Sequence, residues 1–328
     1  SIVWPQPAAL YIPWEEKNMP TEYFEQRERA LLGQRYEQLY AAPQQTAERG
    51  VTVSALRTTP EQFAQRADFP LEPSPFCKAA FVVHQPDFKP GRHPYHHAGV
   101  FYSQEPSASS AAPLLGVQPG MRVLDLCAAP GGKSSQLAAA LQGRGVLVSN
   151  EYVAARAEIL KSNLERMGVS NAVVLNETPA RIAEALPEFF DRVLVDAPCS
   201  GEGMFRKNDA EREWSIEHVK SCAARQLLIL NSAKNALKNG GYMVYSTCTF
   251  SKEENEGVIS RFLAENPDFE LVDSGVTFGR PTLDYARRIF PMDGGEGHFA
   301  AKLHKKGEPY SNLSLIHISE PTRHAQIS

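Results

Sequence analysis

The spacing of hydrophobic residues differs between two parts of the chain, and it changes near residue 112. The earlier part is rich in proline and aromatic side chains and gives only short patterns. From 121 to 306, short apolar runs alternate with longer stretches of helical spacing. Such alternation is typical of a parallel sheet covered by helices on both faces. We therefore expect an α/β protein with a small α+β unit in front of it.

The first part of the chain carries patterns for two helices and two strands. Apolar side chains fall at helical spacing at Phe24, Leu31, Leu32, Tyr36 and Leu39. Residues 51–53 and 81–83 are short apolar runs that predict strands. Thr59, Pro60 and Gln62 predict a second helix start, since threonine caps a helix, proline suits its first turn and glutamine completes a capping box.

The second part predicts a regular series of strands and helices. Five apolar runs predict strands at 121–126, 145–148, 172–175, 192–196 and 242–246. Helical stretches between them are expected at 133–141, 153–167 and 216–237. Gly168 suits the left-handed residue that follows a helix, and we expect Gly240 and Gly241 to end the third helix.

Composition narrows the class of protein. The chain has 328 residues, and 34 Lys and Arg against 38 Asp and Glu give a net charge of −4. This slight negative charge argues against non-specific electrostatic binding to nucleic acid. A local basic patch would still be compatible with RNA binding. No apolar run reaches the roughly 18 residues of a membrane span, and five cysteines make no disulfide framework. We expect a cytoplasmic monomer with reduced thiols and no membrane contact.

Both ends of the chain differ from the rest. Residues 1–18 precede a Met-Pro pair that would suit a translation start, and residues 309–328 follow the last strand-like run without a fold pattern. We expect the two segments to be a non-native leader and a non-native tail. The remaining chain is expected to divide into 19–112 and 113–308.

The loop after the first strand of the series is the first candidate site, because ligands of doubly wound sheets bind beyond the carboxyl ends of the strands. It consists of Cys127, Ala128, Ala129, Pro130, Gly131, Gly132 and Lys133. A phosphate-binding P-loop needs glycine where Cys127 stands, and a dinucleotide fingerprint needs three spaced glycines. Glu151 follows the second strand, 19 residues after Gly132 (151 − 132), where a carboxylate can bind a ribose diol. A nucleoside without polyphosphate indicates S-adenosylmethionine; the alternative is a tight turn with a surface glutamate.

Three further candidate residues follow the fourth and fifth strands. Cys199 and Cys248 are either small buried residues or nucleophiles, since a thiolate is a strong nucleophile. Asp196 ends an apolar strand, where a carboxylate either caps a turn or meets a ligand, and the two thiols nearby favour a ligand. A zinc site would need a Cys-x-x-Cys pair or histidines in the same region, so we expect no metal.

Several segments resemble one family. The motifs LDLCAAPGGKSSQLA, DAPCSGEGMFRK and STCTFSKEENE are similar to those of the Sun/Nop-type RNA cytosine-5 methyltransferases. RIFP and GEGHF, near the end of the second part, resemble the bacterial RsmF-like branch of this family. The resemblance covers about 21–306. It implies a Rossmann-like class I methyltransferase fold, with a seven-stranded, mostly parallel sheet behind a small N-terminal α+β, RNA-recognition-like domain.

The resemblance also implies residue roles. Cys248 would be the nucleophile, Cys199 would assist breakdown of the covalent adduct, and Asp196 would hold the cytosine edge and line the cofactor site. The 127–133 loop and Glu151 would bind S-adenosylmethionine, and Thr178 stands where the family has an adenine-contacting residue. Asp196 would serve as a proton partner for the cytosine ring if it shares a proton. The motifs assign no base for removing the proton from carbon 5.

The function implied is an RNA (cytosine-5)-methyltransferase that forms a covalent Cys–cytosine adduct, acting on 16S ribosomal RNA or the small ribosomal subunit. Basic residues that would meet RNA are Lys78, Lys89, Arg92, Arg206 and Lys207. Two alternatives remain open. One is a DNA cytosine-5 methyltransferase with Cys199 as nucleophile, and the other is a non-catalytic RNA-binding assembly factor.

Overall fold

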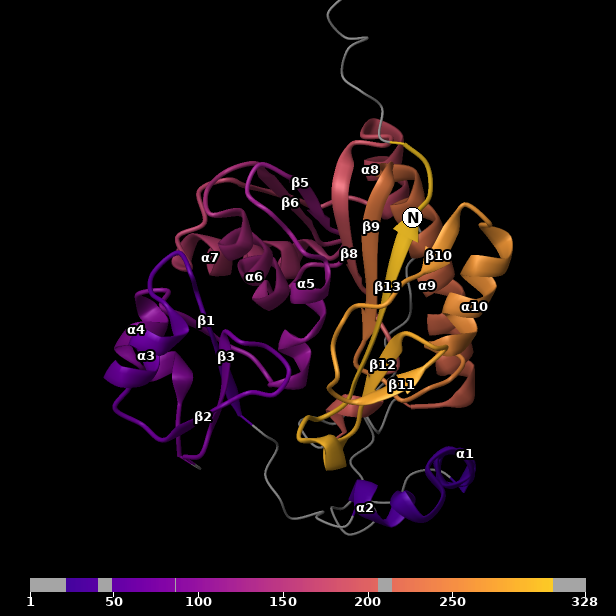
Figure 1. Ribbon diagram of the computed structural model, residues 1–328, viewed down its shortest axis with the longest axis horizontal. Coiled ribbons are helices and arrows are strands. Elements are labelled where there is room, and N and C mark those ends of the chain that lie inside the picture. The colour runs from indigo at the N-terminus through magenta and orange to yellow at the C-terminus, as the bar shows by residue number, and fades with distance from the viewer. Residues whose placement is uncertain (1–21, 41–48, 86, 206–213, 309–328) are drawn as a thin grey trace, which may run out of the picture.

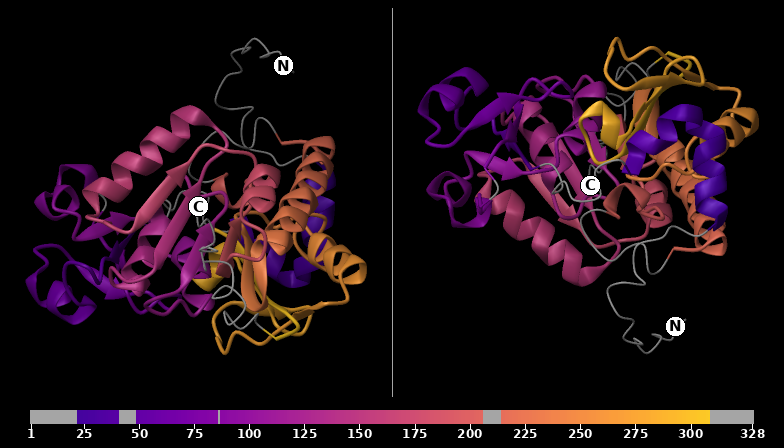
Figure 2. Two further views of the ribbon diagram at one scale, coloured as in Figure 1. Left: turned by 90° about the horizontal axis from the view of Figure 1, so that it is seen from above. Right: turned by 90° about the horizontal axis from the view of Figure 1, so that it is seen from below.

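The computed structural model describes residues 22–40, 49–85, 87–205 and 214–308 (Figures 1 and 2). The expected leader and tail, and the basic pair Arg206 and Lys207, lie outside the described residues. Two sheets organise this part of the chain, one of four strands near the N-terminus and one of nine strands after it.

The N-terminal unit is an antiparallel sheet with strand order β2-β3-β1-β4. Its strands are β1 (Gly50–Val53), β2 (Leu71–Pro73), β3 (Ala80–Val83) and β4 (Phe101–Ser103), and its helices are α3 (Pro60–Arg66) and α4 (Pro94–His97). Thr59 caps α3 by accepting a hydrogen bond from the Gln62 backbone N–H at 3.2 Å, which confirms the predicted start. Phe63 and Phe101 lie at the centre of the aromatic core of this unit.

The amphipathic segment before this unit forms two helices instead of one. α1 (Glu22–Leu32) and α2 (Tyr36–Tyr40) are separated by a 3-10 turn that begins at Gly33, whose φ is +57°. The predicted apolar face is buried, but against the second part of the chain. Phe24 meets Trp214 edge-on at 5.5 Å between ring centroids. Figure 1 shows both helices at the end of the molecule beside β11 and β12.

The large sheet has the order β11-β12-β13-β9-β8-β5-β6-β7, with β10 paired to β13. Its strands are β5 (Arg122–Asp125), β6 (Val146–Asn150), β7 (Ala172–Leu175), β8 (Phe190–Asp196), β9 (Leu237–Thr247), β10 (Phe269–Leu271), β11 (Arg280–Thr282), β12 (Ala286–Ile289) and β13 (His298–Lys305). β5 to β9 are mutually parallel, as predicted, and β13 runs antiparallel to β9. The seven strands from β12 to β7 form the expected sheet, and the short strands β10 and β11 extend it.

Helices cover both faces of this sheet. They are α5 (Ala111–Leu114), α6 (Gly132–Leu141), α7 (Ala154–Arg166), α8 (Pro179–Ala185), α9 (Ile216–Ala236) and α10 (Glu256–Glu265). In Figure 1, α5, α6 and α7 lie on one side of β8 and β9, and α9 and α10 lie on the other. Successive residues of β8 serve different cores, because strand side chains alternate between the faces. Leu194 packs in the core beneath α5 and α6, whereas Val193 and Val195 join the core beneath α9.

The prediction that Gly240 and Gly241 end the third long helix is wrong. α9 ends at Ala236, and Leu237 is already extended, with φ −84° and ψ 132°, and pairs with Phe190 of β8. Leu237 is fully buried, so core packing of this side chain stops the helix before the glycines are reached. Gly240 and Gly241 lie inside β9, near the register shift between Phe190 and Arg192.

Candidate active site

The fourth and fifth predicted strands bring the two cysteines together. The Cys199 loop follows β8, the Cys248 loop follows β9, and the two strands are parallel with Asp196 beside Ser246. The Cys199 and Cys248 Sγ atoms lie 3.3 Å apart, and both cysteines are free and half-buried. Their spacing allows both thiols to meet the same small molecule.

Backbone contacts fix the two loops against each other. The Gly203 N–H donates to the Cys248 carbonyl at 2.9 Å. A Cβ at Gly203 would lie 2.8 Å from the Gly297 carbonyl oxygen and 3.0 Å from that of Cys248, so only glycine fits there. The Ser200 and Thr249 hydroxyls bond at 2.9 Å. The thiols are therefore held by a preformed framework.

A buried carboxylate that sequence reasoning did not single out supports the same loops. Glu254 accepts hydrogen bonds from the Ser200 backbone N–H at 3.0 Å and from the Gln226 amide at 2.8 Å. Burial raises the pKa of Glu254 to about 7. The available signal was its place inside the STCTFSKEENE motif, six residues after Cys248 (254 − 248).

Asp196 lies in an ion pair at the end of β8. Its carboxylate accepts from Lys133 Nζ at 2.7 Å and from the Ser246 hydroxyl at 2.7 Å. Burial opposes ionisation, but the charges of Lys133 and His298 and the hydrogen bonds from Lys133 and Ser246 together hold the pKa of Asp196 below its ordinary value. Asp196 is therefore ionised at neutral pH, and its carboxyl group carries no proton to share with a ligand.

The two thiols differ in their surroundings. The hydrogen bond from the Cys199 thiol, together with the charge of Lys133, lowers the pKa of Cys248. The same contact, burial and the nearby Glu254 carboxylate raise the pKa of Cys199. Cys248 is therefore the better thiolate of the two, mainly because of the hydrogen bond between the thiols.

The predicted cofactor loop lines a cavity of about 240 Å³ next to this ion pair. Its walls are Tyr102, Ser103, Gln104, Glu105, Ala108, Asp125, Cys127, Ala128, Ala129, Pro130, Gly132, Lys133, Asp196 and Met204. The segment from Tyr102 to Ala108 therefore supplies one wall, and the sequence predicted no role for it there. The Tyr102 hydroxyl donates to the Pro130 carbonyl at 3.1 Å and joins the two walls.

Three predicted cofactor residues lie outside the lining of this cavity. Gly131, with φ +113°, begins α6 and packs beside Leu160. Glu151 is buried at the end of β6 and accepts from the Val153 N–H at 2.9 Å. Thr178 caps α8 by accepting from the Arg181 N–H at 3.3 Å.

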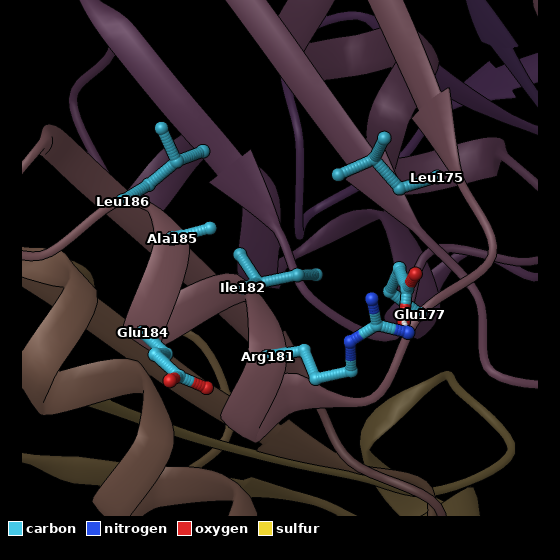
Figure 3. Close-up of a pocket in the computed structure, with 7 residues that line it drawn as sticks. All are labelled: Leu175, Glu177, Arg181, Ile182, Glu184, Ala185 and Leu186. Carbon is cyan, nitrogen blue, oxygen red and sulfur yellow. Dashed lines mark ion pairs between the residues drawn. The ribbon is translucent and has the colours of Figure 1, made fainter.

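A second cavity of about 410 Å³ lies near Thr178, between the end of β7 and α8 (Figure 3). It is lined by Leu175, Glu177, Arg181, Ile182, Glu184, Ala185 and Leu186. Figure 3 shows Arg181 turned toward Glu177, with which it forms an ion pair of 3.0 Å. None of the predicted site residues lines this cavity, whereas seven of them line the smaller one.

Comparison with known families decides the class of protein. Residues 112–304 match the family of 16S rRNA methyltransferase RsmB/F, and residues 19–106 match the N-terminal domain of 16S rRNA methyltransferase RsmF. The chain belongs to the RsmB/F family. The resemblance found in the motifs is confirmed, and so is the Rossmann-like methyltransferase fold.

Individual relatives agree with the family. The ribosomal RNA small subunit methyltransferase F of Vibrio cholerae is 39% identical over 283 residues, covering 81% of this chain and 59% of the relative. That of Erwinia tasmaniensis is 36% identical over 304 residues, covering 87% and 63%. A solved structure of a methyltransferase homolog protein from Pyrococcus horikoshii has a TM-score of 0.78 at 30% identity, covering 87% of this chain and 95% of that one. The chain thus spans about three fifths of the curated relatives.

The described residues contain neither a metal-binding cluster nor a helix that could span a membrane. Within residues 22–40, 49–85, 87–205 and 214–308, no cluster of three or more His, Cys, Asp or Glu side chains is arranged to hold a metal ion. No helix in the same ranges is long and apolar enough to span a membrane.

Proposed function

We propose that this chain transfers a methyl group from S-adenosylmethionine to carbon 5 of a cytosine in RNA, with 16S ribosomal RNA as the substrate. The observation that carries the proposal is the pair of thiols, 3.3 Å apart, beside the Lys133–Asp196 ion pair. The match to 16S rRNA methyltransferases over 112–304 supports the reaction and the substrate. Such a substrate would place the activity in the cytoplasm.

Cys248 is the proposed nucleophile. Carbon 5 of cytosine is a weak nucleophile, but addition of the Cys248 thiolate to carbon 6 makes carbon 5 enamine-like. Covalent catalysis of this kind divides one difficult step into two easier ones. The lowered pKa of Cys248 supports this assignment, because it increases the thiolate fraction at neutral pH.

Asp196 and Lys133 are proposed to hold the base. An ionised carboxylate accepts hydrogen bonds, so Asp196 suits the exocyclic amino group of cytosine. Lys133 is positioned to stabilise negative charge that develops on the ring when the thiolate adds. The target cytosine must leave its stack to reach them.

We propose that the cavity of about 240 Å³ holds part of the cofactor. Bound S-adenosylmethionine would supply an electrophilic methyl group. We propose that the 127–133 loop and Asp196 hold it, with Glu151 at the ribose and Thr178 at the adenine. Gly132 lets the Tyr102 ring lie close to this wall, because a Cβ there would be 3.1 Å from the ring and would force it to shift.

After methyl transfer, the carbon 5 proton must leave so that the bond between Cys248 and carbon 6 can break. We propose that Cys199 assists this release. We also propose that 19–112 is an RNA-binding domain and that the protein is a monomer. The rim residues Lys78, Lys89 and Arg92 would contact phosphates, which position RNA without reading its sequence.

The test is transfer of labelled methyl from S-adenosylmethionine to unmodified 16S rRNA. Cys248→Ala should abolish labelling and retain cofactor binding, while the control Cys77→Ala, in the N-terminal unit, should label normally. Cys199→Ala should leave protein bound covalently to RNA. Labelling that survives Cys248→Ala and disappears in Cys199→Ala would favour the DNA-type mechanism. A parent protein that binds RNA without labelling it would favour an assembly factor.

A further inference from the structure

His298, the first residue of β13, is a buried polar side chain that neither the motif roles nor the mechanism above uses. It is 3% exposed, and neither ring nitrogen makes a hydrogen bond of normal geometry with the part of the chain that the structure describes. The nearest backbone group is the Gly297 carbonyl, whose interaction with the ring is weak. Buried polar atoms are nearly always hydrogen-bonded, so a ring in this state calls for an explanation.

The ring lies in the candidate active site. Its Nε2 is 3.9 Å from Asp196 Oδ1, the same oxygen that accepts from the Ser246 hydroxyl. β13 pairs with β9 so that Ala300 faces Ser246 and Phe299 faces Thr247. His298 therefore comes next to Cys248 along the two chains and lies on the same face of the sheet as Ala300 and Ser246.

The surrounding charges determine the state of the ring. Lys133 from α6, Asp196 from β8 and Glu105 from the segment after β4 act on it. Burial, together with the charge of Lys133, lowers the pKa of His298 to about 4. The ring is therefore neutral near pH 7, with one nitrogen that donates and one that accepts.

We propose that His298 is a positioning residue for Asp196. When cytosine enters, the Nε2–H of His298 forms a hydrogen bond with Asp196 Oδ1 and keeps the carboxylate directed at the amino group of the base. A gap of 3.9 Å is too long for a hydrogen bond, and catalytic hydrogen bonds often tighten only in the substrate complex. Lys133 holds the other oxygen, Oδ2, and the Ser246 hydroxyl donates one hydrogen bond to Oδ1, so Oδ1 keeps a second acceptor position that His298 can fill. This inference rests on the proposed function.

The experiment measures the rate at which the protein forms a covalent adduct with 16S rRNA containing 5-fluorocytosine in place of cytosine. Fluorine cannot leave carbon 5 as a cation, so the adduct accumulates, and its formation does not depend on the later loss of a proton. His298→Phe removes both nitrogens at similar volume, and His298→Gln keeps an amide N–H near the position of Nε2. His304→Phe is the matched control, because His304 lies on β13 and pairs with Glu270 away from the thiols.

We expect His298→Phe to slow adduct formation by about 10-fold to 100-fold, the usual effect of removing a partner that orients a reacting group. The dissociation constant for S-adenosylmethionine should stay within about twofold of the parent value. His298→Gln should recover most of the rate, and His304→Phe should match the parent. If His298→Phe fails to fold, His298→Asn replaces it. Its amide reaches only the position of Nδ1, so it should be slower than His298→Gln.

Several results would overturn the inference. One is adduct formation in His298→Phe at the parent rate. Another is equal loss in the Gln and Asn variants, as a purely structural role predicts. A third is normal adduct formation followed by accumulation of methylated adduct on ordinary 16S rRNA, which would make His298 the base for the carbon 5 proton. A parent protein that forms no adduct would refute the proposed function, and the role of His298 with it.

Discussion

Two cavities near the carboxyl ends of the parallel strands differ more in the burial of their charged residues than in their volume. The larger, of about 410 Å³, lies between β7 and α8, and its charged pair is Glu177 with Arg181. The smaller, of about 240 Å³, is lined by both residues of the Lys133–Asp196 pair. The side chain of Arg181 is 71% exposed, whereas that of Lys133 is only 10% exposed.

This difference in burial determines which cavity can support chemistry. Water screens an exposed i,i+4 pair, and such a pair contributes little to stability. A buried pair acts through a lower effective dielectric, so it can shift the pKa of neighbouring groups and stabilise charge in a reaction. The lowered pKa of Asp196 beside the smaller cavity is one consequence of this.

The largest expected effect comes from removing the cation of the smaller cavity. Lys133→Met leaves Asp196 buried without its partner and takes away the charge that lowers the pKa of Cys248. We expect methyl transfer to fall by roughly 100-fold to 1000-fold, as when one preorganised charge-stabilising group is lost. Initial rates with labelled S-adenosylmethionine measure it, and Lys161→Met, on the exposed face of α7, is the control.

The same variant should change the pH dependence of the rate. In the parent, the lowered pKa of Asp196 keeps the carboxylate ionised well into the acidic range. Without Lys133, burial raises this pKa, so activity should be lost at a higher pH as the solution is acidified. An acidic limb that stays at the parent position would contradict the claim that this ion pair controls Asp196.

Much of this arrangement was predictable because it follows from local patterns. Each of the parallel strands β5, β6, β7 and β8 is a run of apolar residues, and a parallel sheet brings the ends of its strands to one edge. The motifs that follow these strands therefore predict that Asp196, Cys199 and Cys248 lie close together. The prediction that Gly240 and Gly241 end α9 fails for the opposite reason. The helix ends at the buried Leu237, and this burial depends on contacts with distant segments and not on a local pattern.

The remaining parts of the site depend on contacts between distant segments. Tyr102 and Glu105 reach the cavity from β4 and the chain after it, and no spacing relates them to the 127–133 loop. β11 and β12 are short and rich in arginine, so their sequences do not resemble buried strands. His298 is marked only by the GEGHF segment, which indicates the family branch but not the pairing of β13 with β9.

A moderate effect is expected where the N-terminal unit meets the cofactor loop. Tyr102→Phe removes a hydrogen bond to the Pro130 carbonyl, which Asn163 also contacts at 2.8 Å. Since the hydrogen bond from Asn163 to this carbonyl remains, we expect the free energy of S-adenosylmethionine binding to weaken by about 0.5–1.5 kcal/mol, or roughly 2-fold to 10-fold in affinity. Titration calorimetry checks this, with Tyr95→Phe in the same unit as control. Unchanged binding would show that β4 lines the cavity without ordering its loop.

The smallest effect is expected at the larger cavity, and it is the sharpest test of the comparison. Arg181→Ala breaks an exposed pair with Glu177 that is worth about 0.3–0.5 kcal/mol, so thermal stability should change very little. The variant keeps the backbone N–H that Thr178 uses to cap α8, so this helix start should survive. Methyl transfer and cofactor affinity should stay within about twofold of the parent. A larger loss of affinity would mean that the cofactor reaches past Thr178 into the larger cavity, and that burial of charge alone does not distinguish the two cavities.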